Sequence, residues 1–402
     1  MHKKIISLAL CALLGVSCLG VSACGETKEP FDPDAQYKAT KEEWQQLLTT
    51  ENFEFTFMNK ATDAREYVTF AGSDYEVKLY ESSIQKNVIY AYDVETVGGE
   101  TVTTLSKRAK DETEWSEPQT VETPTHAYST DDFAPFFNFV KDNYDSFEFK
   151  INYYEYTAKG DELAEIGNLI AAHTGNTGAY TDVVTVHITQ EPTSGKRISN
   201  IIFDCKGNDQ ASYSNRVDFN DVGSTILESD FDGAFGNLTN FTLVGGTGLD
   251  YGEYAFTENA FRIYTPNIED PTRQEAFWQK DGEQYIYYSK NAQGVWQKDA
   301  TKTQEQYENA REQIADLLFG CLANKKDNFY SKNEGKLYYA YGSLTVDAGL
   351  YTYDFSNVRV TLDDAGKITG ATYNLKMTIG QASSEHSFVL TAGNAAITFP
   401  TV

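Results

Sequence analysis

The same order of predicted secondary-structure elements occurs twice along this chain, and this repetition limits its possible folds more than any other feature. Each copy begins with a short amphipathic helix that leads into a strand. These pairs are Thr40–Leu48 before Phe55–Met58, and Ser229–Leu238 before Phe241–Val244. Further strands, a polar stretch with one tryptophan, a second helix and more strands then follow in each copy. We therefore expect two tandem domains of similar construction.

Period-two alternation of apolar residues predicts the remaining strands of both copies. In the first copy they are 66–70, 76–80, 88–94, 101–105, 147–156, 183–188, 201–204 and 217–223. In the second copy they are 253–256, 261–264, 275–279, 284–289, 336–340, 358–362, 372–377 and 388–393. Asp281-Gly282 predicts a tight hairpin between two of these strands. An additional helix, Asp161–His173, is expected in the first copy alone.

The second helix of each copy carries one wide apolar face and must therefore lie on a sheet. In the first copy Asp131 or Asp132 is expected to cap it, with Pro135 in its first turn. In the second copy Thr303 and Gln306 form a capping-box pattern. The sequence thus predicts an α+β protein with two tandem domains, 39–227 and 228–402, each a curved antiparallel sheet packed on one or two helices.

The N-terminal segment reads as an export signal. Lys3 and Lys4 precede an apolar run that ends in small residues at Val21-Ser22-Ala23-Cys24. This tetrapeptide resembles the lipobox of bacterial lipoproteins. The resemblance implies a signal peptide at 1–23, cleavage before Cys24 and acylation of Cys24. An uncleaved anchor or an ordinary secretory signal are the alternatives.

Residues 24–38 then form a polar, proline-interrupted tether. The lipobox resemblance places the folded body on the bacterial cell membrane, lipid-anchored and facing outside the cytoplasm. The formal net charge of −26 makes nucleic acid a poor partner, because phosphate backbones are repelled. Partners are therefore expected to be the membrane, reached through the anchor, and a hydrophobic small molecule or lipid, while a protein partner stays open.

The order of elements resembles the lipoprotein-carrier fold of outer-membrane lipoprotein chaperones and of mycobacterial lipid-carrier lipoproteins. That resemblance implies a sheet wrapped around helices, with a cavity for an acyl chain or another amphipathic ligand. The cavity would be lined by helix residues, namely Phe136, Phe137, Val140, Ile314, Leu317 and Leu318. The same residues would equally well fill a solid core.

Aromatic residues make up 14 % of the chain, and several gather around the Asp281-Gly282 hairpin. Exposed rings of Trp278, Tyr285 and Trp296 would give a platform for stacking a glycan. Cross-strand aromatic pairing and core filling explain them without a ligand. An envelope scaffold or interaction protein is a further alternative.

The sequence offers no catalytic motif that we can identify, and no catalytic residue, metal site or cofactor is expected. His126, His173, His187 and His386 are dispersed along the chain, which favours packing roles. Asp230-x-Asp232-Gly233 lacks the later ligands of a calcium loop. Cys205 and Cys321 are expected to be buried free thiols, with a disulfide between them as the alternative. We therefore expect a protein without enzymatic activity.

Overall fold

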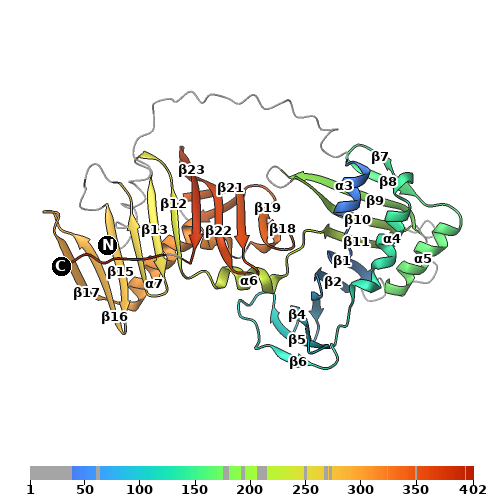
Figure 1. The fold of residues 1–402 in the computed structure, drawn as a ribbon, viewed down its shortest axis with the longest axis horizontal. Helices are drawn as coiled ribbons and strands as arrows, with labels where there is room; N and C mark the ends of the chain where they lie inside the picture. The colour runs from blue at the N-terminus through green and yellow to red at the C-terminus, as the bar shows by residue number, and fades with distance from the viewer. Residues whose placement is uncertain are drawn as a thin grey trace. The chain divides into compact units, whose positions relative to one another are not determined.

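The structure is a computed structural model that describes residues 39–59, 64–174, 181–191, 195–205, 215–248, 251–266, 270, 274–323, 325–348, 351–393 and 395–402. Within these ranges the chain divides into two compact units (Figure 1). The N-terminal domain holds the described residues up to Ser229 together with Tyr330–Lys332. The C-terminal domain holds Asp230–Phe329 and Asn333–Val402, so α6 and β18, described with it below, each begin or end with residues assigned to the N-terminal domain. The expected α+β class with two tandem domains is confirmed, since each domain contains an antiparallel sheet and helices.

The N-terminal domain is built on an 11-stranded sheet. Its elements are α3 (Lys41–Leu47), β1 (Asn52–Asn59), β2 (Ala64–Ala71), β3 (Asp74–Glu81), β4 (Lys86–Val97), β5 (Glu100–Ala109), β6 (Gln119–Val121), η1 (Thr130–Asp132), α4 (Ala134–Asp142), η2 (Tyr144–Ser146), β7 (Glu148–Phe149), β8 (Tyr153–Thr157), α5 (Asp161–Thr174), β9 (Thr181–Glu191), β10 (Gly195–Cys205) and β11 (Asn215–Val222). The strands run in the order β6-β5-β4-β3-β2-β1-β11-β10-β9-β8-β7. The first and last strands of the domain are therefore neighbours.

The C-terminal domain is built on a 12-stranded sheet. Its elements are α6 (Glu228–Gly236), β12 (Phe241–Gly245), β13 (Gly252–Thr257), β14 (Ala260–Tyr264), β15 (Glu275–Asp281), β16 (Gln284–Lys290), β17 (Trp296–Lys302), α7 (Gln304–Leu318), η5 (Gly320–Leu322), η6 (Lys326–Asn328), β18 (Phe329–Lys332), β19 (Leu337–Ala340), β20 (Leu344–Ala348), β21 (Tyr351–Leu362), β22 (Ile368–Ile379) and β23 (Ala382–Ala392). The strand order is β17-β16-β15-β14-β13-β12-β23-β22-β21-β19-β18, with β20 paired to β21.

The two sheets have corresponding strand orders. In each, a meander of six strands is followed by a helix, and the last strand of the domain returns to pair with the first, β11 with β1 and β23 with β12. The main difference lies between the last strands, where α5 occupies the place that β20 takes in the C-terminal domain. The predicted helix at Asp161–His173 is thus confirmed as α5.

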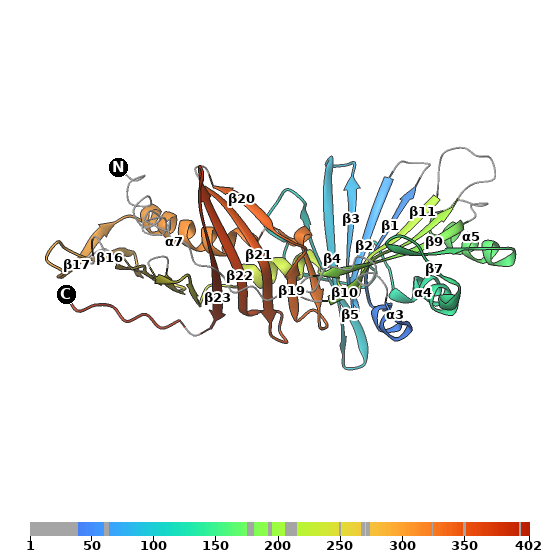
Figure 2. The ribbon, with the colours of Figure 1, turned by 90° about the horizontal axis from the view of Figure 1, so that it is seen from above.

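The core of the N-terminal domain lies between one face of its sheet and the helices α3 and α4 (Figure 2). Phe55 pairs directly with Phe219 on neighbouring strands, and both side chains are fully buried on that face. Trp44 of α3 is also fully buried and lies 4.6 Å, ring to ring, from Tyr154 of β8. Alternation of apolar residues along the strands therefore gives the sheet its helix-covered side.

In the C-terminal domain, α7 covers one face of the β14–β16 strands. The Tyr307 ring of α7 lies 5.5 Å from Phe261, 6.3 Å from Trp278 and 5.4 Å from Tyr285. The predicted hairpin is confirmed, because Asp281 pairs with Gln284 across a two-residue loop. Gly282 has φ +60° there, a left-handed conformation that favours glycine.

The start of α4 differs from the prediction. Ser129, and neither Asp131 nor Asp132, caps this region: Asp131 N donates to Ser129 Oγ at 3.2 Å and Ser129 N donates to Asp132 Oδ2 at 2.9 Å. These bonds close the separate 3-10 turn η1. The α4 helix follows without a side-chain cap and has Pro135 in its first turn. The predicted aspartate cap is therefore wrong, because the acidic pair belongs to the preceding turn.

The α6 helix begins at Glu228, one residue before the predicted Ser229 start. The acceptor for its first N–H groups comes from far along the chain. Glu228 N donates to Glu76 Oε2 at 2.9 Å, while Ser229 N and Ser229 Oγ each donate to Glu76 Oε1 at 2.9 Å. All three residues belong to the N-terminal domain.

Candidate functional site

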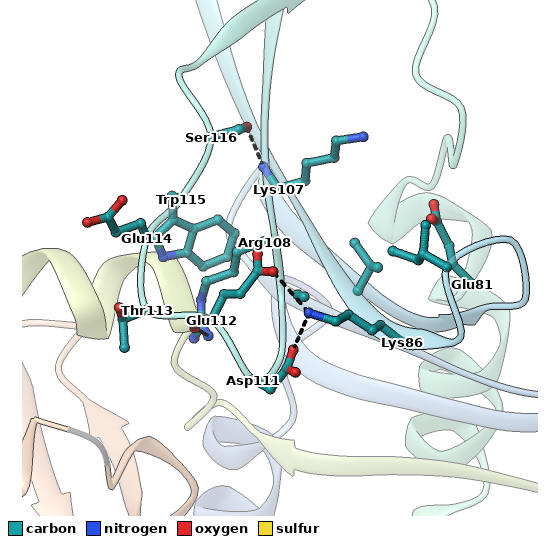
Figure 3. Close-up of a pocket in the computed structure, with 13 residues that line it drawn as sticks. Glu81, Lys86, Lys107, Arg108, Asp111, Glu112, Thr113, Glu114, Trp115 and Ser116 are labelled. Atoms are coloured by element: carbon teal, nitrogen blue, oxygen red, sulfur yellow. Dashed lines mark hydrogen bonds and ion pairs between the residues drawn. The ribbon is translucent and has the colours of Figure 1, made fainter.

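A groove of about 680 Å³ opens on the N-terminal domain and is the candidate functional site (Figure 3). Three segments line it: the β3–β4 turn, the end of β5 and the loop that follows β5. The loop from Asp111 to Ser116 is exposed except for Trp115, whose side chain is half-buried. The groove therefore combines one large aromatic side chain with charged side chains of both signs.

Arg108 fixes the floor of this groove. It stands near the end of β5, where its backbone pairs with Ile89 of β4. Its Nη2 donates to Glu228 Oε2 at 2.5 Å, and its Nη1 donates to the Glu112 carbonyl oxygen at 2.8 Å. The guanidinium also lies 4.9 Å from the Trp115 ring centroid (Figure 3). The guanidinium of Arg108 and the ring of Trp115 are thus held together by a cation–π contact.

Arg108 belongs to a largely buried group of charged side chains that also contains Glu228, Lys78 and Glu76. Glu228 also accepts from Lys78 Nζ at 3.1 Å, and Glu76 is fully buried. Glu54 also acts on Lys78, so three carboxylates and two cations are gathered here. Burial by itself lowers the pKa of Lys78, but the carboxylates of Glu228, Glu76 and Glu54 outweigh burial, so its pKa is raised. Lys78 therefore stays charged at neutral pH.

The exposed part of the groove is organised by Lys86. Its Nζ lies 3.0 Å from Glu112 Oε1 and 3.3 Å from Asp111 Oδ1 (Figure 3). Hydrogen bonds to Glu112 and Asp111 raise the pKa of this lysine. Ser116 closes the loop, because Lys107 N donates to its Oγ at 3.0 Å and its own N donates to the Lys107 carbonyl at 2.9 Å.

These groups suit non-covalent recognition. The lining residues include no histidine or cysteine, and Ser116 Oγ already accepts a hydrogen bond from the backbone. Glu114 is exposed at the rim. Trp115 offers an apolar surface next to this carboxylate. The lining residues of the groove thus present charged groups of both signs and one indole ring.

The predicted cavity residues of the N-terminal domain lie in a filled core. Phe136, Phe137 and Val140 are at most 4 % exposed. The Phe136 ring is 5.1 Å from Phe203, and the Phe137 ring is 4.9 Å from Phe219. These side chains are brought together by α4, and neighbouring rings occupy the space around them.

The predicted cavity residues of the C-terminal domain all belong to α7. Ile314 is half-buried. The side chains of Leu317 and Leu318 lie outside the described part of the structure, although their backbones end the helix.

The three residues of the predicted glycan platform do not share one face of their sheet. Trp278 faces α7 together with Tyr285, which is 8 % exposed. Trp296 lies on the opposite face, with its ring 5.4 Å from Phe277. Adjacent residues of a strand point to opposite faces, so Phe277 and Trp278 separate the two tryptophans.

Two of the predicted packing histidines lie against tyrosine rings. The ring of His187 lies 5.1 Å from Tyr153, and His126 lies 5.1 Å from Tyr90. The His173 side chain is outside the described part, and His386 lies in β23. Over the described ranges, no group of three or more His, Cys, Asp or Glu residues could hold a metal ion.

Cys24 and the rest of the predicted signal and tether lie outside the described residues. Cys205 ends β10 with its side chain also outside them, and Cys321 is half-buried in η5. Among the helices that the structure describes, none has both the length and the apolar character needed to cross a membrane.

Sequence reasoning missed the groove. Its one local signal is Trp115 in an otherwise charged and exposed stretch. Arg108 and Glu228 are 120 residues apart in the sequence, so their pairing leaves no local pattern.

Comparison with known proteins shows neither a family nor a function for this chain. No family model matches the chain, and no curated protein matches it. Among solved structures, a porin-like protein from Bacteroides uniformis ATCC 8492 is similar at 10% sequence identity, over 85% of this chain and 96% of that chain, with a TM-score of 0.12. A likeness at this TM-score supports no conclusion about fold or function.

Proposed function

We propose that this protein is a lipid-anchored protein of the bacterial envelope, outside the cytoplasm, that binds a protein partner without catalysing a reaction. The groove around Trp115 and Arg108 is the binding site in this proposal. The observation that carries it is the Trp115 ring held 4.9 Å from the Arg108 guanidinium at the floor of an open groove.

Tryptophan and arginine are the side chains most enriched at the energetic centres of protein interfaces. Here Glu228 and the Glu112 carbonyl fix Arg108 in advance, and Trp115 stacks on its guanidinium, so ordering these side chains on binding costs little entropy. The exposed carboxylate of Glu114 lies next to Trp115 at the rim. The partner that fits is a segment with a basic side chain next to an apolar one.

Two sequence features support the proposed location. Val21-Ser22-Ala23-Cys24 matches the lipobox pattern, and a net charge of −26 disfavours contact with anionic headgroups. Replacing Cys24 by alanine should release the protein from the membrane fraction or leave its signal uncleaved. A variant that stays anchored and normally processed would contradict the anchor.

An apolar ligand held between sheet and helix is the second candidate function, from the resemblance to lipoprotein carriers. In the N-terminal domain such a ligand would have to displace Phe136 and Phe137 from contact with Phe203 and Phe219. Because of this displacement, we rank binding of an apolar ligand below binding of a protein partner at the groove. Native mass spectrometry of protein extracted in mild detergent, together with a fluorescent fatty-acid probe, separates the two. A bound lipid would favour the cavity.

The groove itself is tested by chemical crosslinking on intact cells. Trp115→Ala and Glu114→Lys should each reduce the yield of one defined crosslinked adduct, since they remove the apolar and the acidic contact. Glu117→Ala is the matched control, because Glu117 is exposed in the same loop and does not line the groove. Equal adduct yields in all three variants would refute the groove as the binding site.

A further inference from the structure

The C-terminal domain carries an aromatic patch on the face of β15–β17 that is opposite α7. Phe277, Ile286 and Tyr288 form a small cluster that is separate from the core under α7, and each is at most 6 % exposed. Trp296 packs at its edge. The patch does not belong to the groove or to the proposed function.

The chain itself covers this patch with residues 395–402, which we call the tail. Ile397 and Phe399 pack on the cluster, and the Phe399 ring lies 5.3 Å from Tyr288 and 6.0 Å from Phe277. Figure 2 shows the tail and α7 on opposite sides of these strands. The tail is thus a peptide ligand that the domain supplies to itself.

The tail crosses the strands and forms no strand of its own (Figure 1). From β23 to β15 it passes four strand spacings, about 19 Å. Six residues lead from Gly393 to Phe399, and fully extended they reach about 20 Å. The tail therefore has little slack when it covers the patch of its own copy.

Few contacts hold the tail in place. Two hydrogen bonds to Asn240 fix the chain where the tail begins. Gly393 N, just before the tail, donates to the Asn240 carbonyl at 2.8 Å, and Ala395 N, the first residue of the tail, donates to Asn240 Oδ1 at 2.9 Å. Beyond them its anchors are the side chains of Ile397 and Phe399, and both are only half-buried. Such an attachment is open to exchange.

The same face of the sheet exposes a second apolar feature. Val244 of β12 and Val389 of β23 pair directly and are 39% and 52% exposed. Residues that pair directly on neighbouring strands lie on the same face of a sheet. Thr242 pairs with Ala255, Ala255 with Arg262, and Arg262 with Phe277, so Thr242 lies on the same face as Phe277, which the tail covers. Thr242 and Val244 are two apart in one strand and share a face.

We propose that two copies of this chain pair through this face and exchange their tails, so that each tail covers the patch of the other copy. Every copy carries both the tail and a patch that fits it, which makes the contact self-complementary around a two-fold axis. Short connections with little slack favour such exchange. The pairing buries Val244 and Val389 against the second copy.

Site-specific photo-crosslinking tests the exchange on the full chain. A photoreactive phenylalanine at position 399 is placed in unlabelled and nitrogen-15-labelled copies, which are mixed before irradiation. Peptides linking one isotope's tail to the other isotope's patch are expected. Links confined to a single copy at high protein concentration would overturn the proposal, even if dimers form.

A second measurement leaves the tail unchanged. In sedimentation equilibrium, Val389→Lys should raise the dimer dissociation constant at least about tenfold, because it places a charge in the interface. Val295→Lys is the control, since Val295 is 59% exposed in the β16–β17 turn, outside β12 and β23. Monomeric wild-type protein at high concentration, or equal effects of both variants, would overturn the proposal.

Discussion

Replacing Glu228 by alanine should destabilise the N-terminal domain by about 3 kcal/mol. The Glu228 carboxylate accepts from Lys78 at 3.1 Å and from Arg108 at 2.5 Å, and the side-chain exposures are 10% for Glu228, 15% for Lys78 and 8% for Arg108. Its removal leaves Lys78 and Arg108 without their shared ion-pair partner, while Glu76 and Glu54 still attract Lys78. Breaking a buried ion pair from one side typically costs about 3–5 kcal/mol, and Glu76 keeps the loss near the lower limit.

Thermal unfolding followed by tryptophan fluorescence measures this loss. The N-terminal domain contains Trp44 and Trp115, and the C-terminal domain contains Trp278 and Trp296. A Trp278→Phe, Trp296→Phe background therefore reports on the N-terminal domain alone. For a domain of this size about 3 kcal/mol corresponds to a decrease of about 6–12 °C in Tm.

Lys86→Ala is the matched control, because it also removes one partner from ion pairs near the groove, but these pairs are exposed. It should leave the Tm unchanged within error. Arg108→Leu combined with Glu228→Leu should lose less stability than Glu228→Ala, since one buried cation is then absent. If Glu228→Ala lowers the Tm no more than Lys86→Ala, the reasoning about the buried charges is refuted.

Three further predictions concern the packing and titration of the N-terminal domain. Phe219→Ala should lower the free energy of unfolding, measured in urea, by about 3–5 kcal/mol, because the Phe219 ring is fully buried. A decrease as small as that of a surface substitution would contradict the filled core. Burial raises the pKa of Tyr75 to about 12, above the value of about 10 expected in the unfolded chain. The contribution of Tyr75 to the free energy of unfolding is therefore complete below about pH 10 and is lost as the pH rises through about 12. Absorbance at 295 nm should show this late ionisation, and Tyr75→Phe should remove it. Burial lowers the pKa of His187 below its ordinary value of about 6.5. The free energy of unfolding should therefore fall as the pH decreases below about 6.5. An NMR titration of His187 with a midpoint above that value would contradict this prediction.

Local patterns were sufficient to predict much of the fold. The capping boxes at Thr40 and Thr303 are both present, with Glu43 N donating to Thr40 Oγ1 and Gln306 N donating to Thr303 Oγ1. The turn at Gly282 and the alternating strands were also readable, because each depends on residues close together in the sequence. The predicted α4 cap was wrong because Ser129 and Asp132 form a capping box of their own around the preceding 3-10 turn η1, a break in the helix that the apolar pattern did not reveal.

The candidate site could not be predicted in the same way. Its floor depends on contacts between β3, β5 and the start of α6, such as Glu76 with Ser229, which are 153 residues apart. Whether Phe136 fills a core or lines a cavity depends on Phe203 and Phe219, which come from later strands. Filling and lining residues have the same composition, so only the three-dimensional packing separates them.

Photo-crosslinking from the groove in living cells tests the proposed function most directly. A photoreactive residue at position 113, which lines the groove and is exposed, should give one defined adduct that disappears when Trp115→Ala is added. The same residue at position 100, exposed at the start of β5, should not give this adduct. Absence of any adduct from position 113, or an adduct that persists in Trp115→Ala, would contradict partner binding through the groove.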